Sequence, residues 1–257
     1  MKVSIITAVL NGEKTIYDCV ESIAKQTYRH IEHVVIDGGS TDRTLDMIHK
    51  WGINDTTVIT EPDNGLYDAM NKGIKCARGD IIGILNSDDM YADENVIGRV
   101  VNSIAEYDSD TCYGDLLYLD CKDINRQVRY WKAGAFNKEN FRRGWMPPHP
   151  TFFVRRHVYE KYGSFNLNFP LAADYELMLR LLYKHKITTI YIPEVMVKMR
   201  TGGRCSPGLL NTTKVVFENY KAWKMNDLKP NPMTFVLKPF SKLRQLNYRP
   251  SLLPSKY

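Results

Sequence analysis

The first half of the chain alternates short apolar segments with segments of helical periodicity, and this order limits the folds available to it. The apolar segments are rich in β-branched residues, which favour strands. The others repeat apolar side chains at helical spacing, as Ile16, Val20 and Ile23 do. Strands are expected at residues 3–8, 33–36, 57–60 and 81–85, and helices at 15–26, 42–51 and 66–77. This order predicts an α/β fold with a mainly parallel sheet covered by helices on both faces.

Polar residues follow three of the four predicted strands. Asn11 comes after the first strand, Asp37 after the second, and the stretch Asn-Ser-Asp-Asp at residues 86–89 after the fourth. In an open parallel sheet, ligands bind outside the carboxyl ends of the strands. We therefore expect these side chains to line one binding site.

The adjacent carboxylates of Asp88 and Asp89 end a strand that is predicted to be buried. Their mutual repulsion is unfavourable unless a cation or a hydrogen-bond donor lies between them. A surface turn also accepts such a pair. A hard divalent cation, Mg²⁺ or Mn²⁺, held by one or two carboxylates and by ligand phosphates, explains why a strand directs two carboxylates to one point. The pair therefore favours a metal site.

Two further turns allow both a structural and a functional interpretation. Residues 37–42, Asp-Gly-Gly-Ser-Thr-Asp, suit a strand-to-helix turn, and they lack the G-x-G-x-x-G pattern of a dinucleotide site. Residues 61–73 contain a turn and then a helix that keeps Asp68, Asn71 and Lys72 within one turn. A solvated helix face has the same composition, so both interpretations stay open.

Two stretches of the second half carry further candidate groups. His149 lies in the proline-rich segment 146–153, either as a hydrogen-bonding residue of the loop or as a ligand contact. Asp174 lies at the start of a helix within residues 171–182, whose leucines form an apolar face. An acid at this place also complements the helix dipole, which is the structural interpretation of Asp174.

The composition is typical of a globular protein. The 257 residues are 44% hydrophobic, enough for one large domain or for a domain with an appendage. No apolar run approaches the roughly 18 to 20 residues that span a bilayer, and residues 1–15 suit a first strand better than a signal peptide. The five cysteines include no C-x-x-C pair, which is typical of free thiols in a reducing cytosol.

The net charge of +6 is unevenly distributed along the chain. From residue 221 onward there are eight basic residues and one aspartate, so the rest of the chain is close to neutral. Apolar residues lie between these charges, a pattern that suits an anionic membrane surface, although a solvated or disordered tail has the same composition. Nucleic acid is a disfavoured partner because no aromatic and basic platform occurs elsewhere.

Together these motifs resemble those of the family 2 glycosyltransferases, most closely the bacterial branch that builds exopolysaccharide, capsule and lipopolysaccharide chains. The matching stretches are 3–11, 22–28, 37–42, 65–73 and 86–89, and the resemblance covers residues 1–205. It implies a GT-A fold, a nucleotide-sugar donor, a divalent metal and inversion at the anomeric carbon. It also implies a nucleotide-binding half at 1–115, an acceptor and catalytic-base half at 116–205, and a C-terminal helix and basic tail at 206–257.

The resemblance implies roles for individual residues, with some departures from the family pattern. Asp37 matches the acid near the nucleoside, but Gly38 stands where many members have a second aspartate. Asn86 replaces the first acid of the common Asp-x-Asp-Asp pattern, and Met70 stands where many members carry arginine. The implied contacts to the nucleotide-sugar are Thr7, Asn11, Asp37, Asp68, Asn71, Lys72, Asn86 and Asp88, and the implied metal ligands are Asp88 and Asp89.

For the acceptor half, Asp174 matches the acid of a Glu-Asp motif that serves as catalytic base, although Ala173 replaces the glutamate. His149, Glu176 and Arg204 are candidate contacts to the acceptor or the diphosphate. Residues 127–131 partly match the Gln-x-x-Arg-Trp motif of processive synthases, but the arginine is one place early and the segment precedes the expected base. We therefore expect a single sugar to be added to a lipid-linked glycan acceptor, by a cytoplasmic enzyme at the inner face of the cell membrane.

Several alternatives stay open. Uridine diphosphate is the expected nucleotide, and guanosine and thymidine diphosphates are the others. A nucleotidyltransferase would need a basic, glycine-rich loop after the first strand, for which residues 9–14 are a poor match. A non-catalytic subunit of a polysaccharide assembly complex would keep the fold without turnover, yet the acidic residues named above favour an enzyme.

Overall fold

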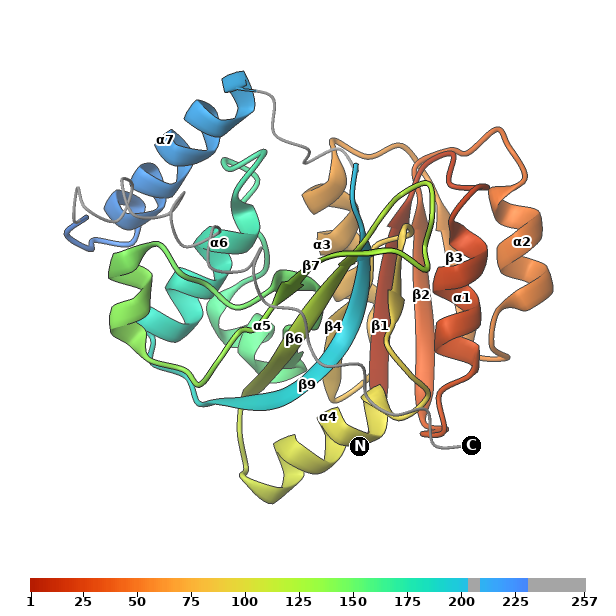
Figure 1. Cartoon of the computed structure of the whole chain (residues 1–257), viewed down its shortest axis with the longest axis horizontal. Coiled ribbons are helices and arrows are strands. Elements are labelled where there is room, and N and C mark those ends of the chain that lie inside the picture. The colour runs from red at the N-terminus through yellow and green to blue at the C-terminus, as the bar shows by residue number, and fades with distance from the viewer. Residues whose placement is uncertain (203–208, 231–257) are drawn as a thin grey trace.

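The computed structural model describes residues 1–202 and 209–230, without the side chains of 209–212. The predicted α/β class is confirmed, because within the described residues helices cover both faces of a nine-stranded sheet (Figure 1). Arg204 and the part of the basic tail beyond residue 230 lie outside the described residues.

The amino-terminal half alternates strands and helices regularly. All four predicted strands and all three predicted helices are present, with ends that differ by a few residues. Their bounds are β1 Val3–Val9, α1 Ile16–Ala24, β2 Ile31–Asp37, α2 Thr44–Trp51, β3 Thr56–Thr60, α3 Leu66–Cys76 and β4 Ile81–Ile84. The strands pair in parallel in the order β3-β2-β1-β4, so their carboxyl ends lie at one edge.

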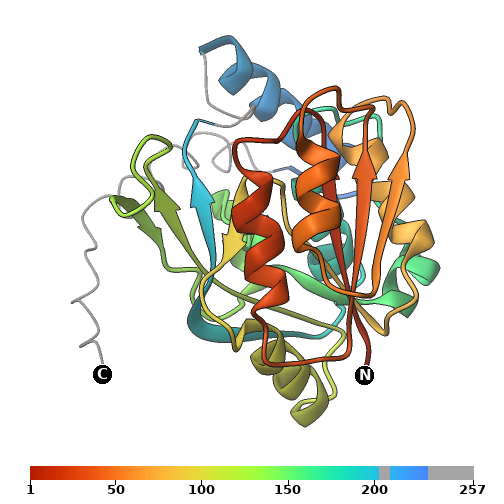
Figure 2. The same ribbon diagram turned by 90° about the vertical axis from the view of Figure 1, so that its right-hand side faces the viewer.

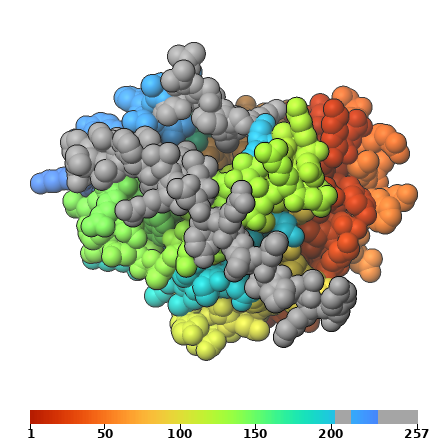
Figure 3. Space-filling model, viewed as in Figure 1, coloured from red at the N-terminus to blue at the C-terminus, as the bar shows by residue number. Residues whose placement is uncertain are grey.

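The remaining elements extend this sheet in a mixed arrangement. They are β5 Asp89–Tyr91, α4 Val96–Glu106, β6 Thr111–Leu119, β7 Gln127–Trp131, η1 Lys138–Arg143, η2 His149–Thr151, β8 Phe153–Arg155, α5 Arg156–Tyr162, α6 Ala173–Met178, η3 Leu179–Lys184, β9 Thr189–Arg200 and α7 Leu209–Met225. Beyond β4 the strand order is β8-β6-β9-β5, and β7 pairs with β6. β6 and β9 are parallel, whereas β8 and β5 pair antiparallel with their neighbours. Residues 121–128 are exposed, and Figure 3 shows this segment at the surface beside the amino-terminal elements.

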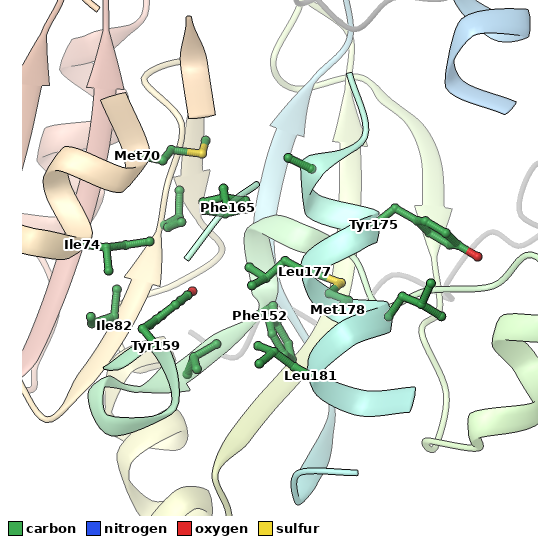
Figure 4. Packing of buried hydrophobic residues seen from close by; sticks show 14 of the residues in the cluster. Met70, Ile74, Ile82, Phe152, Tyr159, Phe165, Tyr175, Leu177, Met178 and Leu181 are labelled. Atoms are coloured by element: carbon green, nitrogen blue, oxygen red, sulfur yellow. The ribbon is translucent and has the colours of Figure 1, made fainter. Parts of the chain in front are cut away.

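The two faces of the sheet bury separate apolar cores. Successive residues of a strand point to opposite faces, so Ile5 of β1 packs with residues of α1 and α4, whereas Ile6 packs with residues of α3 and α6. Figure 2 shows α1 and α2 side by side over one face of the sheet. Figure 4 shows the other core, where Met70 of α3 and Leu177 of α6 point into the same apolar layer. This layer joins the two halves of the chain.

The C-terminal helix α7 packs on α6 (Figure 1). Trp223 is fully buried, and its indole N–H donates to the Tyr175 hydroxyl at 2.8 Å. The Glu218 carboxylate accepts the main-chain N–H groups of Leu171 at 3.0 Å and Ala172 at 2.8 Å. These contacts fasten α7 to the rest of the fold, and the domain boundary at residue 205 stays a prediction. In the described part of the chain, no helix has the length and apolar character needed to cross a membrane.

Candidate active site

The loops after β1 and β2 are joined at the carboxyl edge of the sheet. Val9 of β1 pairs with Asp37 of β2 at the last position of their register. The main-chain N–H of Asn11 donates to the Ser40 hydroxyl at 2.8 Å, and the side-chain oxygen of Asn11 accepts the N–H of Thr41 at 2.9 Å. Asn11 makes these contacts from a left-handed backbone conformation with φ of 52°. It therefore fastens one loop to the other.

The Asp37 carboxylate holds the loop that follows it. Asp37 is fully buried and accepts the main-chain N–H groups of Gly39 at 3.2 Å and Ser40 at 3.1 Å. A Cβ atom at Gly38 would lie 2.7 Å from the Asp63 carboxylate, so a larger residue at position 38 requires the Asp63 side chain to move. Sequence reasoning missed Asp63 as an acid of this edge, because the Pro-Asp-Asn-Gly turn at 62–65 accounts for it without a ligand.

The turn after β4 contains buried oxygen atoms that have no partner. Asp89 is fully buried and accepts the side-chain N–H of Asn86 at 2.8 Å. Burial and the neighbouring Asp88 raise the pKa of the Asp89 carboxyl well above its ordinary value. Within the described residues, Oδ1 of Asn86 and Oδ1 of Asp89 are buried without a hydrogen bond. The half-buried Asp88 carboxylate also has no hydrogen-bond or ion-pair partner among those residues.

These unpartnered oxygens fit a divalent cation. Buried amide and carboxylate oxygens without donors are unfavourable, and hard cations such as Mg²⁺ and Mn²⁺ take oxygen ligands of this kind. Among residues 1–202 and 209–230, no group of three His, Cys, Asp or Glu side chains is arranged to hold a metal ion. A cation held here would take few ligands from these residues and would need oxygens of another group to complete its coordination.

Arg200, at the end of β9, holds the turn after β4. Its guanidinium donates to the main-chain oxygen of Asp88 at 2.8 Å and forms an ion pair with Asp18 of α1. Arg200 is only 7% exposed. Sequence reasoning missed this residue because it is 112 positions from Asp88 and belongs to no motif. The antiparallel pairing of β9 with β5 brings Arg200 to this turn, and local sequence patterns do not reveal that pairing.

Asp174 lies in the first turn of α6, and its carboxylate contacts side chains from two other elements. Oδ1 accepts the Tyr67 hydroxyl at 3.2 Å, and Oδ2 lies 3.4 Å from Nδ1 of His149. The Asp174 side chain is 19% exposed, so a substrate can reach it. The structure thus brings together two predicted site residues, Asp174 and His149. It also places Tyr67 against Asp174, a contact that neither the residue type nor the position of Tyr67 in the sequence indicates.

His149 lies beside Asp174, and the charge of Asp88 also acts on its imidazole. Burial lowers the pKa of its imidazole, against the opposing influence of the charges on Asp174 and Asp88. The imidazole is therefore neutral at pH 7. The segment η2, which carries His149, packs against β4, the strand that leads to Asp88, so Asp88 and Asp174 belong to one region. This region combines oxygens that suit a cation with a carboxylate that can accept a proton.

Thr7 and Asn71, both predicted to contact the nucleotide-sugar, have side chains that are already engaged. Thr7 is fully buried, and its hydroxyl lies 3.0 Å from Nε2 of the buried His33. The Asn71 amide donates to the main-chain oxygen of Phe165 at 2.8 Å and accepts its N–H at 2.9 Å. Both side chains hold the fold together, and their contacts with a ligand stay predictions.

Asp68 and Lys72 hold the turn that leads into α3. Lys72 donates to the main-chain oxygen of Pro62 at 2.6 Å and forms an ion pair with Glu61 at 3.0 Å. Asp68 accepts the main-chain N–H of Asn64 at 2.9 Å. A ligand contact of either residue also stays a prediction.

Glu176, a candidate contact to the acceptor or diphosphate, is buried between helices. It is 2% exposed, and its carboxylate accepts the Arg180 guanidinium at 2.9 Å and the Asn226 amide at 3.0 Å. A carboxylate in these contacts fastens α6 to α7, so its placement offers no support for a ligand contact. Arg204, the remaining candidate, lies outside the described residues.

Sequence comparisons identify relatives along most of the chain. The family model for glycosyl transferase family 2 matches residues 4–163. The PGL/p-HBAD biosynthesis glycosyltransferase of Mycobacterium bovis is 33% identical over 215 residues, which are 81% of this chain and 79% of that protein. The glycosyltransferase GlyG of Streptococcus pneumoniae is 34% identical over 126 residues, which are 48% of this chain and 42% of that protein.

Solved structures of glycosyltransferases share the fold. TarS of S. aureus, residues 1–349, matches with a TM-score of 0.71 at 19% identity, over 95% of this chain and 73% of that one. The mannosyltransferase PcManGT of Pyrobaculum calidifontis matches with a TM-score of 0.65 at 17% identity, over 94% of this chain and 69% of that one. The predicted GT-A fold is thereby confirmed. Family model, curated relatives and fold agree that the chain belongs to glycosyltransferase family 2 and is a glycosyltransferase.

Proposed function

We propose that the enzyme transfers one sugar from a nucleotide-sugar to an acceptor hydroxyl, with inversion at the anomeric carbon and with Mg²⁺ or Mn²⁺ as cofactor. The observation that carries this proposal concerns two carboxylates, Asp88 and Asp174: His149 contacts Asp174, and its segment η2 packs against β4, the strand that leads to Asp88. Asp88 adjoins the unpartnered buried oxygens that suit a cation. Asp174 contacts two neutral side chains and is accessible to a substrate. Sugar transfer from a nucleotide donor uses these two groups at one centre.

The donor binds at the carboxyl edge of the amino-terminal strands in this proposal. Asp88 and the oxygens beside it hold a divalent cation, which, when bound, neutralises the negative charge that grows on the leaving nucleoside diphosphate. The joined loops after β1 and β2 hold the nucleoside, and Asp37 supports the second loop from within. Arg200 keeps the acidic turn in its position.

Asp174 takes the proton of the acceptor hydroxyl. An alcohol is a weak nucleophile, and a carboxylate within hydrogen-bond reach increases its reactivity by accepting its proton during attack. The acceptor oxygen forms a bond to the anomeric carbon while the bond from that carbon to the diphosphate oxygen breaks. A single displacement of this kind inverts the anomeric centre without a covalent sugar intermediate.

A uridine diphosphate sugar is the proposed donor. TarS of S. aureus has been solved in complex with UDP and with UDP-GlcNAc, at TM-scores of 0.69 and 0.70. PcManGT has been solved with GDP-Man and Mn²⁺. These neighbours support a nucleotide-sugar donor and a divalent cation, and they leave guanosine diphosphate as the alternative nucleotide.

A thermal-shift screen tests the donor and the cation together. We expect UDP with Mn²⁺ to raise the unfolding midpoint more than GDP or TDP with Mn²⁺, because a ligand that binds only the native state stabilises it. UDP-sugars that raise the midpoint are then tested for metal-dependent release of UDP. A chain whose midpoint responds to no nucleoside diphosphate, with or without Mn²⁺, would contradict the proposal.

For the acceptor we propose a lipid-linked glycan in cell-surface polysaccharide synthesis, reached by peripheral contact with the inner face of the cell membrane. The eight basic residues from position 221 onward support this contact, since each one near an anionic leaflet contributes about 1 kcal/mol. Truncation after Pro230 keeps α7 and removes residues 231–257. Co-sedimentation with anionic vesicles should fall on truncation and at high salt. Full-length protein that stays in the supernatant at low salt would exclude membrane binding.

A further inference from the structure

The Asp174 carboxylate is contacted on both of its oxygens by side chains from outside its own helix. The Tyr67 hydroxyl donates to Oδ1 at 3.2 Å, and His149 places Nδ1 3.4 Å from Oδ2. Tyr67 belongs to α3, in the half that forms the nucleotide edge, and His149 belongs to η2, in the acceptor half. The two contacts therefore reach Asp174 from both halves of the chain.

Tyr67 is itself held in place by its surroundings. Its ring packs against Phe165 with 5.3 Å between ring centroids. The main chain of Phe165 is fixed to α3 by the two hydrogen bonds with the Asn71 amide. Asn71 lies one helical turn after Tyr67, so tyrosine, phenylalanine and amide form one packed unit. The Tyr67 hydroxyl is thus directed at Asp174 by a rigid support.

His149 is also held firmly. It lies between Pro148 and Pro150, whose rings restrict the backbone. Thr151 is fully buried, and its hydroxyl lies within hydrogen-bond distance of two main-chain oxygens, that of Gly114 at 3.0 Å and that of Pro148 at 2.9 Å. The loop that carries His149 is therefore anchored to β6.

The contacts of Asp174 differ from those of a helix cap. An acid that caps a helix accepts main-chain N–H groups, whereas within the described residues both Asp174 oxygens are contacted by side chains. The main chain that leads into α6 is held by Glu218 instead, through the N–H groups of Leu171 and Ala172. Asp174 is therefore not needed to start its helix.

We propose that Tyr67 and His149 are positioning residues for Asp174, holding its carboxylate where the acceptor hydroxyl arrives. This inference rests on the proposed function, in which Asp174 is the base. A general base works only within hydrogen-bond reach of the proton it takes, and a misplacement of about 1 Å can cost on the order of 100-fold in rate. Two side-chain contacts at fixed places restrict the carboxylate to one orientation.

The test measures donor affinity, acceptor KM and kcat for Tyr67→Phe, His149→Asn and His149→Ala. We expect Tyr67→Phe and His149→Ala each to lower kcat by about 10-fold, with donor affinity and acceptor KM within about twofold of wild type. The amide nitrogen of asparagine occupies the place of Nδ1, so His149→Asn should keep more activity than His149→Ala. Tyr17→Phe and His157→Gln are matched controls, because these residues pair with the distant acids Glu21 and Asp110.

A second arm repeats the substitutions in an Asp174→Asn background. If Tyr67 and His149 act through Asp174, their substitution in this background causes little further loss, because coupled residues are not additive. The positioning role would be overturned if the loss of kcat in a double variant equalled the product of the two single losses. A Tyr67→Phe enzyme with wild-type kcat would also overturn it. Neither result would contradict the role of Asp174 as base. Wild-type transfer by Asp174→Asn itself would overturn the base and, with it, this inference.

Discussion

One fully buried aspartate ends β2 and another follows the turn after β4, yet the two carboxylates are satisfied differently. At the end of β2, the Asp37 carboxylate accepts the main-chain N–H groups of Gly39 and Ser40. After the turn that follows β4, Asp89 is the first residue of β5; one of its oxygens accepts the Asn86 amide, and the other has no partner in the described residues. Asp88 then adds a like charge beside it. The loop after β2 is complete without a ligand, whereas the turn after β4 is not.

In the proposed function, this difference separates an acid that serves the fold, Asp37, from acids that serve binding, Asp88 and Asp89. A carboxylate that accepts main-chain N–H groups stabilises the folded loop around it. A buried carboxylate with an unpartnered oxygen and a charged neighbour destabilises the fold until a cation binds. A place at the carboxyl end of a parallel strand is therefore not enough to assign a ligand contact. The hydrogen-bond partners of each oxygen decide the role.

The largest effect is expected from Asp88→Asn, which removes one charge from the turn after β4 at nearly constant volume. We expect the affinity for a nucleoside diphosphate with Mn²⁺ to fall on the order of 100-fold or more, because a cation ligand is lost. The unfolding midpoint should stay the same or rise, because repulsion with Asp89 is relieved. Titration calorimetry and thermal unfolding measure the two quantities. If Asp88→Asn bound the nucleoside diphosphate with Mn²⁺ as tightly as the wild type, the turn after β4 would not differ from the loop after β2 in its role in binding.

Asp37→Ala should show the opposite pattern at the end of β2. The main-chain N–H groups of Gly39 and Ser40 lose a charged acceptor in partly buried hydrogen bonds, and we expect the free energy of unfolding to fall by about 2 kcal/mol. Urea denaturation measures this loss. Asp46→Ala, at an exposed position of α2, is the control and should change stability by less than about 0.5 kcal/mol. A stable Asp37→Ala protein that no longer binds nucleotide would assign Asp37 to the ligand instead.

The smallest effect concerns His33, which lies on β2 against Thr7. Burial lowers the pKa of the His33 imidazole to about 4. The unfolded chain takes up this proton near pH 6.5, so the stability due to neutral His33 is present above that pH and is lost as the pH falls towards 4. Between pH 7 and 5.5 we expect the free energy of unfolding to fall by about 1 kcal/mol.

His33→Gln isolates this contribution, because all other titrating groups are shared with the wild type. Urea unfolding of both proteins at pH 7 and 5.5 makes the comparison. The variant should lose less stability than the wild type over this interval. Equal losses would mean that His33 takes up its proton at the same pH in the folded and unfolded states.

The amino-terminal half was predictable because local rules determine it. Strands buried on both faces of a parallel sheet are continuous apolar runs, and each of the four was located within a few residues. The acceptor half depends on pairings between distant segments, such as β6 with β9 and β5 with β9. Those pairings place Arg200 at the acidic turn, and no local pattern contains them.

The sequence predicted which residue types lie near the candidate site, but it did not predict which partner each polar side chain contacts. Asp88, Asp174 and His149 were located from their motifs, and the structure places His149 against Asp174, on a segment that packs against the strand before Asp88. Asn71 and Glu176 had equally suitable types, yet their polar atoms bind Phe165 and Arg180. Which partner a polar side chain finds depends on packing between elements, and single-sequence patterns do not describe that packing.

The claim that Asp174 takes the proton of the acceptor hydroxyl is tested most directly by comparing transfer and donor binding in Asp174→Asn and wild type. The asparagine keeps the shape of the side chain but cannot act as a base. We predict transfer slowed by roughly 100-fold or more, donor affinity unchanged, and a wild-type product of inverted anomeric configuration by nuclear magnetic resonance. Transfer by Asp174→Asn at a near wild-type rate, or a product of retained configuration, would contradict this mechanism.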